Sequence, residues 1–245
     1  MTTPAPPFNA ISELTSALRT SGYALLKPAD VCSLAHCTLP ELDALAASWN
    51  DLATDNYLKD GGRYRRRRHS CFIDDGAGLA QTTHRAHWQP VEYNALHGGM
   101  HRLFEPIDPA TLALPAWNRL LRALGNACSQ VKGQQPWFVE AHQFRIDTLD
   151  GIGRPTPEGA HRDGVDFVAV LLVGRHHVKG GETRVFEAEG PDGKRFTMLE
   201  PWTLLLLDDA RVIHESTPIQ ATGENGHRDT LVLTWRSGAF QGEDA

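Results

Sequence analysis

Two side chains near the middle of the chain, His161 and Asp163, are of the types that bind iron. They open the apolar run 165–173, which we expect to form a strand, and residues two apart in a strand point to the same side of a sheet. An imidazole and a carboxylate side by side are two of the three ligands of the 2-His-1-carboxylate site, which holds non-haem Fe(II) with open coordination positions. The pair therefore predicts part of an iron site, and that site needs a second imidazole.

The second imidazole is expected from His214. It follows the very apolar stretch 203–207 and lies in the short strand-like segment 211–215. Taken alone, His214 is also compatible with a hydrogen-bonded histidine of the core. Its place after the His-x-Asp pair favours a metal ligand.

Arg228 and Thr230 open the next strand-like run, which ends at Trp235. By the same alternation both side chains point the same way, so they present a guanidinium and a hydroxyl together. A planar guanidinium binds a carboxylate through two parallel hydrogen bonds. We therefore expect this pair to bind the carboxylate of a small molecule.

The order His-x-Asp, distal His and Arg-x-Thr resembles that of the Fe(II)/2-oxoglutarate-dependent dioxygenases. The resemblance implies that His161, Asp163 and His214 bind Fe(II). It implies likewise that Arg228 and Thr230 bind the far carboxylate of 2-oxoglutarate. O2 would be the other reactant, and succinate and CO2 the products. No catalytic residue beyond the metal ligands is implied, because the cofactor carries the difficult chemistry and the protein supplies orientation and exclusion of water.

Three further segments narrow the resemblance. Residues 158–164, 180–183 and 214–219 look like those of bacterial dioxygenases related to L-isoleucine 4-hydroxylase, and a weaker likeness extends into the N-terminal half. The resemblance implies hydroxylation of an unactivated C–H bond in a free L-amino acid or a close derivative.

An amino-acid substrate needs a cation for its carboxylate and an anion for its ammonium group. We expect Arg65 or Arg145 to bind the carboxylate and Glu158 to bind the ammonium. Gln143 and Arg145 share one face of the expected strand 138–148, and we expect that face to line the cavity. The alternative is that this polar face is simply hydrated.

From residue 138 onward the sequence is typical of a β structure. Short runs of β-forming residues are separated by Gly, Pro and Asp clusters, with no helical segment between them. The predicted strands are 138–148, 164–173, 183–189, 194–199, 203–208, 211–215 and 228–236. The predicted fold class is mainly β with flanking helices (α+β), with a double-stranded β-helix, a cupin-like jelly roll, as its core.

We expect a single domain, 1–245. Residues 1–8 are Pro-rich and are predicted to be disordered, 9–135 to form a mixed, partly helical region that packs on the core, and 136–240 to form the β-helix core with the metal site. The helices expected in the mixed region begin after Asn9, after Thr38 and at Pro115.

The segment 63–68 concentrates five arginines in six positions. One interpretation is a basic, hydrated edge strand whose charges discourage aggregation. The other is that alternate arginines, Arg65 among them, reach into the active site and hold an anion. A nucleic-acid interface is a weaker interpretation, because no recognition motif accompanies the run.

The composition excludes some function classes and leaves others open. The net charge of -6 gives no general attraction to nucleic acid or anionic membranes. No apolar run approaches the ~18 residues of a membrane span, and no secretory signal is evident. The four cysteines form no paired motif, so we expect reduced thiols and a cytoplasmic protein. The oligomeric state is not predicted. The alternative functions are a cupin-fold metalloenzyme that does not use 2-oxoglutarate and a non-catalytic binding protein.

Overall fold

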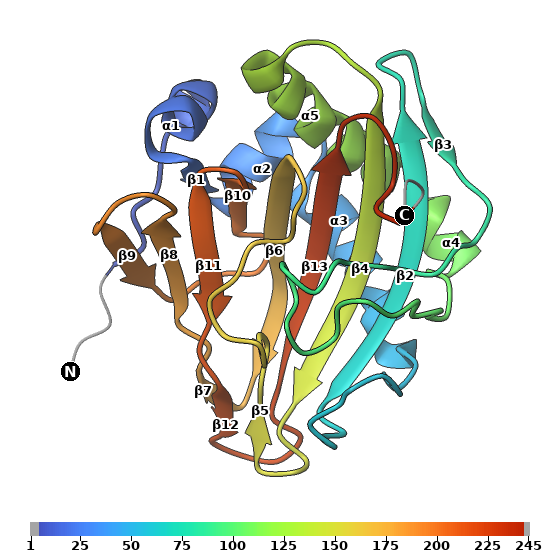
Figure 1. Ribbon diagram of the computed structural model, residues 1–245, viewed down its shortest axis with the longest axis vertical. Helices are drawn as coiled ribbons and strands as arrows, with labels where there is room; N and C mark the ends of the chain where they lie inside the picture. Colours follow the sequence, from blue (N-terminus) through green and yellow to red (C-terminus); the bar gives the residue numbers. More distant parts are fainter. Residues whose placement is uncertain (1–4, 243–245) are drawn as a thin grey trace.

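A seven-stranded antiparallel sheet runs through the whole molecule (Figure 1), and its strands follow the order β1-β10-β6-β13-β4-β2-β3. The computed structural model describes residues 5–242. The bounds of these strands are β1 Tyr23–Leu26, β2 Arg65–Asp74, β3 Leu79–Gln81, β4 Trp137–Asp147, β6 Phe167–His176, β10 Leu204–Asp208 and β13 His227–Arg236. The longest ladders join β13 to β4 and β6, and β4 to β2.

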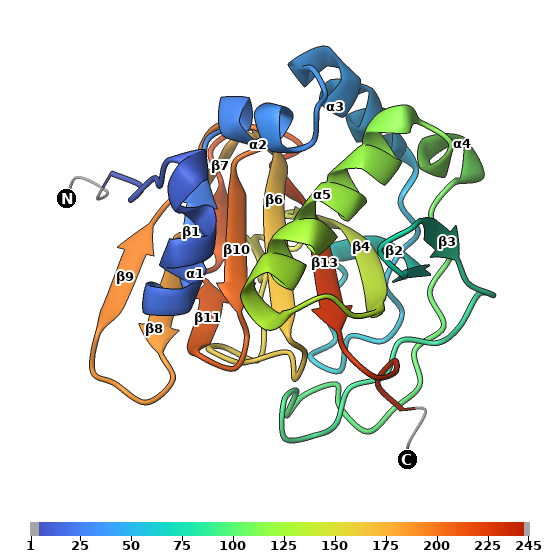
Figure 2. The same ribbon diagram turned by 90° about the horizontal axis from the view of Figure 1, so that it is seen from above.

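Helices cover one face of this sheet (Figure 2). They are α1 Leu14–Ser21, α2 Pro28–Leu34, α3 Leu39–Ala46, α4 Pro109–Leu112 and α5 Pro115–Lys132, with 3-10 turns η1 at Ile11–Glu13 and η2 at Ala47–Asp51. The large hydrophobic core lies between these helices and the sheet, and its bulkiest members include Trp117 of α5 and Trp235 of β13. Apolar residues three and four apart along α5 form the stripe that packs on the sheet.

The helix starts agree with their sequence signals in two cases. At α3 the Glu41 carboxylate accepts a 2.7 Å hydrogen bond from the Thr38 N–H, as a capping box requires. Helix α5 begins at Pro115 as predicted. Asn9, however, does not cap the first helix. Its amide oxygen instead accepts a hydrogen bond from the Leu25 N–H, so that Asn9 fastens the N-terminal segment to β1.

Two small three-stranded sheets lie on the other side of the main sheet. One has the order β11-β8-β9 and the other β5-β12-β7, and Figure 1 shows both in front of the main sheet. Their bounds are β5 Ile152–Gly153, β7 Val178–Gly180, β8 Thr183–Glu187, β9 Gly193–Phe196, β11 Val212–Ser216 and β12 Ile219–Ala221. A second apolar cluster fills one end of the space between the layers, and a cavity occupies the rest.

The fold is therefore mostly β with antiparallel sheets and a jelly-roll core, as the sequence predicts. The expected strands recur with small changes of boundary, but β6 starts at Phe167 and not at 164. The N-terminal region contributes β1, β2 and β3 directly to the main sheet. The arginine-rich part of β2 is not a free edge. It pairs with β4 on one side, and residues 53–55 bond to its backbone on the other, whereas the short β3 pairs only with residues 72–74.

The remaining predictions concern the N-terminal tail, the cysteines and membrane-spanning segments. Residues 1–4, half of the predicted disordered tail, lie outside the described residues. Within the tail's other half, Phe8 packs beside the second apolar cluster. In residues 5–242 no disulfide links the cysteines, and no helix there has both the length and the apolar character that a membrane crossing requires.

Candidate metal centre and substrate cavity

His161, Asp163 and His214 converge at the edge of the cavity. The two histidines pair through their backbones, since each N–H donates to the other residue's carbonyl at 2.9–3.0 Å. Asp163 Oδ2 lies 3.6 Å from His214 Nε2 and 4.0 Å from His161 Nε2. One ligand atom from each residue lies within 4.8 Å of the others, which is a separation that one metal ion can bridge.

The tautomer of His161 and the neutral ring of His214 suit a divalent metal. His161 Nδ1 is 2.9 Å from the Gly159 carbonyl oxygen and donates to it, so the lone pair is on Nε2, facing the other two ligands. Burial lowers the pKa of His161, but the Asp163 and Glu158 carboxylates outweigh that effect and raise it. Burial and the neighbouring His161 hold the pKa of His214 well below its ordinary value, which keeps that ring neutral. Two imidazoles and one carboxylate are the donor set that Fe(II) takes in this geometry.

His161 and Asp163 do not lie in a strand, contrary to the prediction. They lie in the loop before β6, where Asp209 fixes the backbone by accepting hydrogen bonds from the N–H groups of Asp163, Gly164 and Val165 at 2.8–3.2 Å. Gly164 has a φ of +76°, and a Cβ there would lie 2.4 Å from the Tyr93 ring. Burial, together with the Asp163 charge, raises the pKa of Asp209 to about 6. The Asp209 carboxylate therefore holds the His-x-Asp motif in place, and nothing in the spacing of the motif predicts this contact.

Gln89 also orients Asp163. Its amide N–H donates to Asp163 Oδ1 at 3.1 Å, leaving Oδ2 toward the imidazoles. Its amide oxygen accepts from Arg102 at 3.0 Å and from Asn94 at 3.1 Å. A chain of side chains thus connects the metal ligand to a buried arginine, and no local sequence signal points to it.

Arg228 and Thr230 line the same cavity from β13, as predicted. Arg228 is 3% exposed, and its Nε and Nη2 atoms have no hydrogen-bond partner. Burial and the nearby Arg175 lower its pKa to about 10, so the group remains charged at neutral pH. A buried cation with unused donors requires an anion, because an unpaired charge away from water costs several kcal/mol.

The predicted positions of Gln143 and Arg145 are wrong. These residues face away from the cavity: Gln143 donates to Ser48 at 2.6 Å on the helical side of the sheet, and Arg145 pairs with Asp229 at 2.7 Å. The cavity side of β4 carries Phe144 and Ile146. The alternation is as expected, but the apolar members of this stretch form the cavity wall, and the polar members have partners of their own.

The arginines of β2 divide between its two faces. Arg65 and Arg67 are buried and line the cavity, while Arg66 is half-exposed and Arg68 pairs with the exposed Asp51. The hydrated-strand interpretation therefore fails for Arg65 and Arg67. Arg65 is already neutralised, because its Nε lies 2.7 Å from the buried Asp55 carboxylate.

Glu158 lines the cavity at the metal end. Its Oε1 atom is 3.5 Å from His161 Nε2, and its Oε2 atom is buried without a hydrogen-bond partner. This carboxylate therefore has capacity for one more donor close to the metal centre.

Comparisons with known proteins give the class of protein that this site belongs to. The family model described as 2OG-Fe dioxygenase matches residues 46–234, most of the chain. The chain belongs to this family. It is a non-haem iron dioxygenase that uses Fe(II), 2-oxoglutarate and O2.

Solved structures agree with the assignment. The crystal structure of a BsmA homologue from Methylobium petroleophilum is 51% identical, with 98% of each chain covered and a TM-score of 0.92. IDO from Bacillus thuringiensis is 16% identical, with 98% of this chain and 100% of that chain covered and a TM-score of 0.76. The Fe(II)/α-ketoglutarate-dependent dioxygenase TqaL is 21% identical, with 95% and 88% covered and a TM-score of 0.72. The last two show a shared fold. No curated protein matches the sequence.

Proposed function

We propose that the protein hydroxylates an unactivated C–H bond of a free L-amino acid or a close derivative. In this proposal His161, Asp163 and His214 bind Fe(II), and Arg228 with Thr230 binds the far carboxylate of 2-oxoglutarate. The observation that carries it is that one cavity contains both the metal-binding triad and a buried guanidinium with two unused donors. Iron bound there would supply the activation of O2: one oxygen atom of O2 would enter the C–H bond, and the other would enter succinate as 2-oxoglutarate loses CO2.

The chain's own residues bind and orient the reactants. Ile146, Val170 and Val232 provide apolar wall beside Arg228, which excludes water and strengthens the guanidinium–carboxylate pair. Asp209 and Gln89 hold Asp163 in place. Such partners of metal ligands commonly affect metal affinity by about 10- to 100-fold.

The substrate side of the cavity has charges of both signs, as a zwitterion requires. Arginine side chains, among them Arg65, face it from β2 and from the segment that precedes α4, and Glu158 lies at the metal end. We retain Glu158 as the partner of the substrate ammonium, since its buried Oε2 accepts nothing from the described residues. We also propose that the chain is related to the L-isoleucine 4-hydroxylases within the dioxygenase family.

A succinate-release screen tests the proposal. Purified protein with Fe(II), ascorbate and 2-oxoglutarate is incubated with each of the twenty L-amino acids, and succinate is measured against a control without amino acid. At least one amino acid should raise succinate formation and yield a product heavier by one oxygen atom. Succinate at the control level with all twenty would exclude the free proteinogenic amino acids as substrates.

A further inference from the structure

Arg102 is a buried cation with no counter-ion in contact. It is 2% exposed and lines the cavity. Its Nη2 donates to the neutral Gln89 amide at 3.0 Å, and its Nε is buried without a partner. Among residues 5–242 it forms no ion pair. Burial and the neighbouring Arg65 lower its pKa to about 10, so that it stays charged at neutral pH.

The other two arginines of this wall are already engaged. Arg65 pairs with Asp55. Arg67 lies between the rings of Phe104 and Phe144, at 3.7 and 4.4 Å from their centroids, and donates to His142 Nδ1 at 2.7 Å. Arg67 also lies 3.9 Å from the Asp55 carboxylate. Within the described part of the chain, Arg65 and Arg67 each keep one buried nitrogen without a hydrogen-bond partner, but both have a carboxylate within 4 Å, and Arg102 is the one of the three that forms no ion pair.

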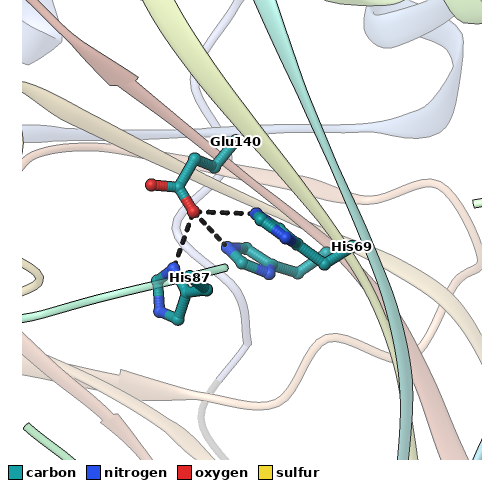
Figure 3. A group of neighbouring side chains, drawn as sticks. His69, His87 and Glu140 are labelled. Atoms are coloured by element: carbon teal, nitrogen blue, oxygen red, sulfur yellow. Dashed lines mark hydrogen bonds and ion pairs between the residues drawn. The ribbon is translucent and has the colours of Figure 1, made fainter. Parts of the chain in front are cut away.

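A cluster of buried histidines around Glu140 bears on this charge balance. Glu140 Oε2 is 2.8 Å from His69 Nε2, 2.6 Å from His87 Nδ1 and 3.7 Å from His142 Nε2. Figure 3 shows these nitrogens gathered around one carboxylate oxygen. The cluster resembles a metal site in composition, and its ligand atoms lie within 4.8 Å of one another.

The geometry favours a hydrogen-bonded frame over a metal site. Two ligands of one tetrahedral zinc ion at ordinary bond lengths lie about 3.3 Å apart, whereas the two short contacts to Glu140 have hydrogen-bond lengths. Because Arg67 donates to His142 Nδ1, the proton of that neutral ring is on Nε2, directed at Glu140, and no lone pair is left for a metal. Burial lowers the pKa of His87 to about 4 and also lowers the pKa values of His69 and His142 below the ordinary value, so the imidazoles are neutral and add no positive charge.

Three carboxylates act on the arginines of this wall, but none of them contacts Arg102. Asp55 and Glu140 make their short contacts with other groups. Glu158 lies at the metal end, where its ion-pair contact is with His161, and it acts on Arg102 only through the cavity. Arg102 therefore faces the cavity without an anion of the described residues in contact.

We propose that Arg102 binds the carboxylate of the substrate, and that Gln89 places this carboxylate at a fixed position relative to the metal ligand Asp163. This inference rests on the proposed function and names the residue that selects an anionic substrate. Gln89 bridges the two side chains through both ends of its amide. A carboxylate on Arg102 is thereby held one amide group away from Asp163, and the rest of the substrate extends toward the metal.

The test compares an amino acid with its amide. The amino acid that gives the most succinate in the screen, and the same compound with a carboxamide in place of its carboxylate, are assayed with wild-type protein, Arg102→Gln and Arg102→Lys. Wild type should prefer the acid by at least 100-fold in kcat/KM. Arg102→Gln should lose at least 100-fold with the acid and little with the amide, and Arg102→Lys should recover part of the preference. An unchanged preference in Arg102→Gln overturns the proposal.

Two controls separate folding from binding. Arg68→Gln removes an arginine of β2 that faces away from the cavity and should leave the preference unchanged. Each variant is also titrated with 2-oxoglutarate in anaerobic Fe(II) solution, where a weak visible charge-transfer band reports an intact co-substrate site. Absence of the band in wild type would refute the proposed function itself. A normal band in Arg102→Gln with an unchanged preference refutes only the role of Arg102.

Metal analysis checks the histidine cluster. Wild type loaded with Fe(II) should hold one metal per chain, and His87→Gln should hold the same. A second equivalent in wild type that His87→Gln loses would assign the cluster to a metal and would overturn its interpretation as a hydrogen-bonded frame, together with the account of the charges around Arg102 that depends on it.

Discussion

Arg228 is the side chain that we propose to bind the far carboxylate of 2-oxoglutarate. Its charge is kept away from water, and two of its donors are unused until an anion arrives. We expect Arg228→Gln to raise the Kd of 2-oxoglutarate by at least about 30-fold, because loss of one partner from a desolvated charge pair costs about 2–5 kcal/mol. Titration of the anaerobic Fe(II) protein, followed by the visible band, measures this Kd. If the variant lost affinity for the amino acid as much as for 2-oxoglutarate, the assignment of Arg228 to the co-substrate would be contradicted.

The three proposed metal ligands should behave alike. His161→Ala, Asp163→Ala and His214→Ala should each abolish succinate formation and lower bound iron, while circular dichroism shows that the protein remains folded. The ligands lie at the edge of the cavity and belong to neither apolar cluster, so removing one should not unfold the chain. Ordinary iron content and activity in any one variant would remove that residue from the metal site.

At the residue scale, the sequence predicts the site residues that belong to a short motif and misses those that act only through contacts with distant parts of the chain. His161, Asp163, His214 and Arg228 carry recognisable spacing. Asp209 and Arg102 do not, because their importance comes from partners that only folding brings near. His87 shows no signal at all, although it is buried within hydrogen-bond distance of Glu140.

The loop before β6 depends on a single acceptor. Asp209 bonds three consecutive backbone N–H groups, and no other side chain of the described residues replaces it there. Asp209→Asn turns one acceptor oxygen into a donor, so at least one of the three N–H groups loses its partner. We expect iron affinity to fall about 10- to 100-fold, measured by competition with a chelator. Unchanged affinity would show that the loop holds Asp163 without this carboxylate.

The start of β2 has an ionic contact that should give stability a defined pH dependence. Asp55 is 3% exposed; burial alone would raise its pKa, but Arg65 and Arg67 outweigh burial and lower it below its ordinary value of 3.8. A depressed folded-state pKa stabilises the protein above the unfolded-state pKa, and this contribution is lost as pH falls through the folded-state value. The free energy of unfolding should therefore drop as the solution is acidified below about pH 4.

Asp55→Asn isolates that contribution. The variant should be about 3–5 kcal/mol less stable at pH 7, because Arg65 is left buried and unpaired. Its stability should also fall less steeply than that of wild type between pH 4 and pH 2. Urea unfolding at several pH values measures both effects. Parallel pH profiles for the two proteins would show that Asp55 is not the group that titrates.

At the element scale, alternation predicted which residues share a face but not which face meets the cavity. In β4 the prediction that Gln143 and Arg145 share one face of the strand is correct, but the prediction that this face meets the cavity is wrong. The reason is that both faces of this strand are buried, one under helices and one under the cavity, so the usual contrast of apolar inside with polar outside is missing. The arginines of β2 show the same effect, since charged side chains there line an interior.

At the scale of the whole molecule, the larger hydrophobic core and the active-site cavity lie on opposite faces of one sheet. Leu233 of β13 belongs to the core under the helices, whereas its neighbour Val232 lines the cavity. Leu233→Ala should lower the free energy of unfolding by about 2–5 kcal/mol, the range for a buried leucine. It should leave the Kd of 2-oxoglutarate unchanged, because the side chain points away from Arg228.

Val232→Ala is the matched variant on the other face. It removes apolar wall beside Arg228 and should weaken 2-oxoglutarate binding while costing less stability than Leu233→Ala. Water admitted beside the guanidinium would screen its pairing with the carboxylate. Urea unfolding and the anaerobic titration, applied to both variants, should give opposite orders of effect. If both variants lost stability and co-substrate affinity in the same proportion, the two faces of the sheet would be mechanically coupled, and the helical layer would have to be counted as part of the active site.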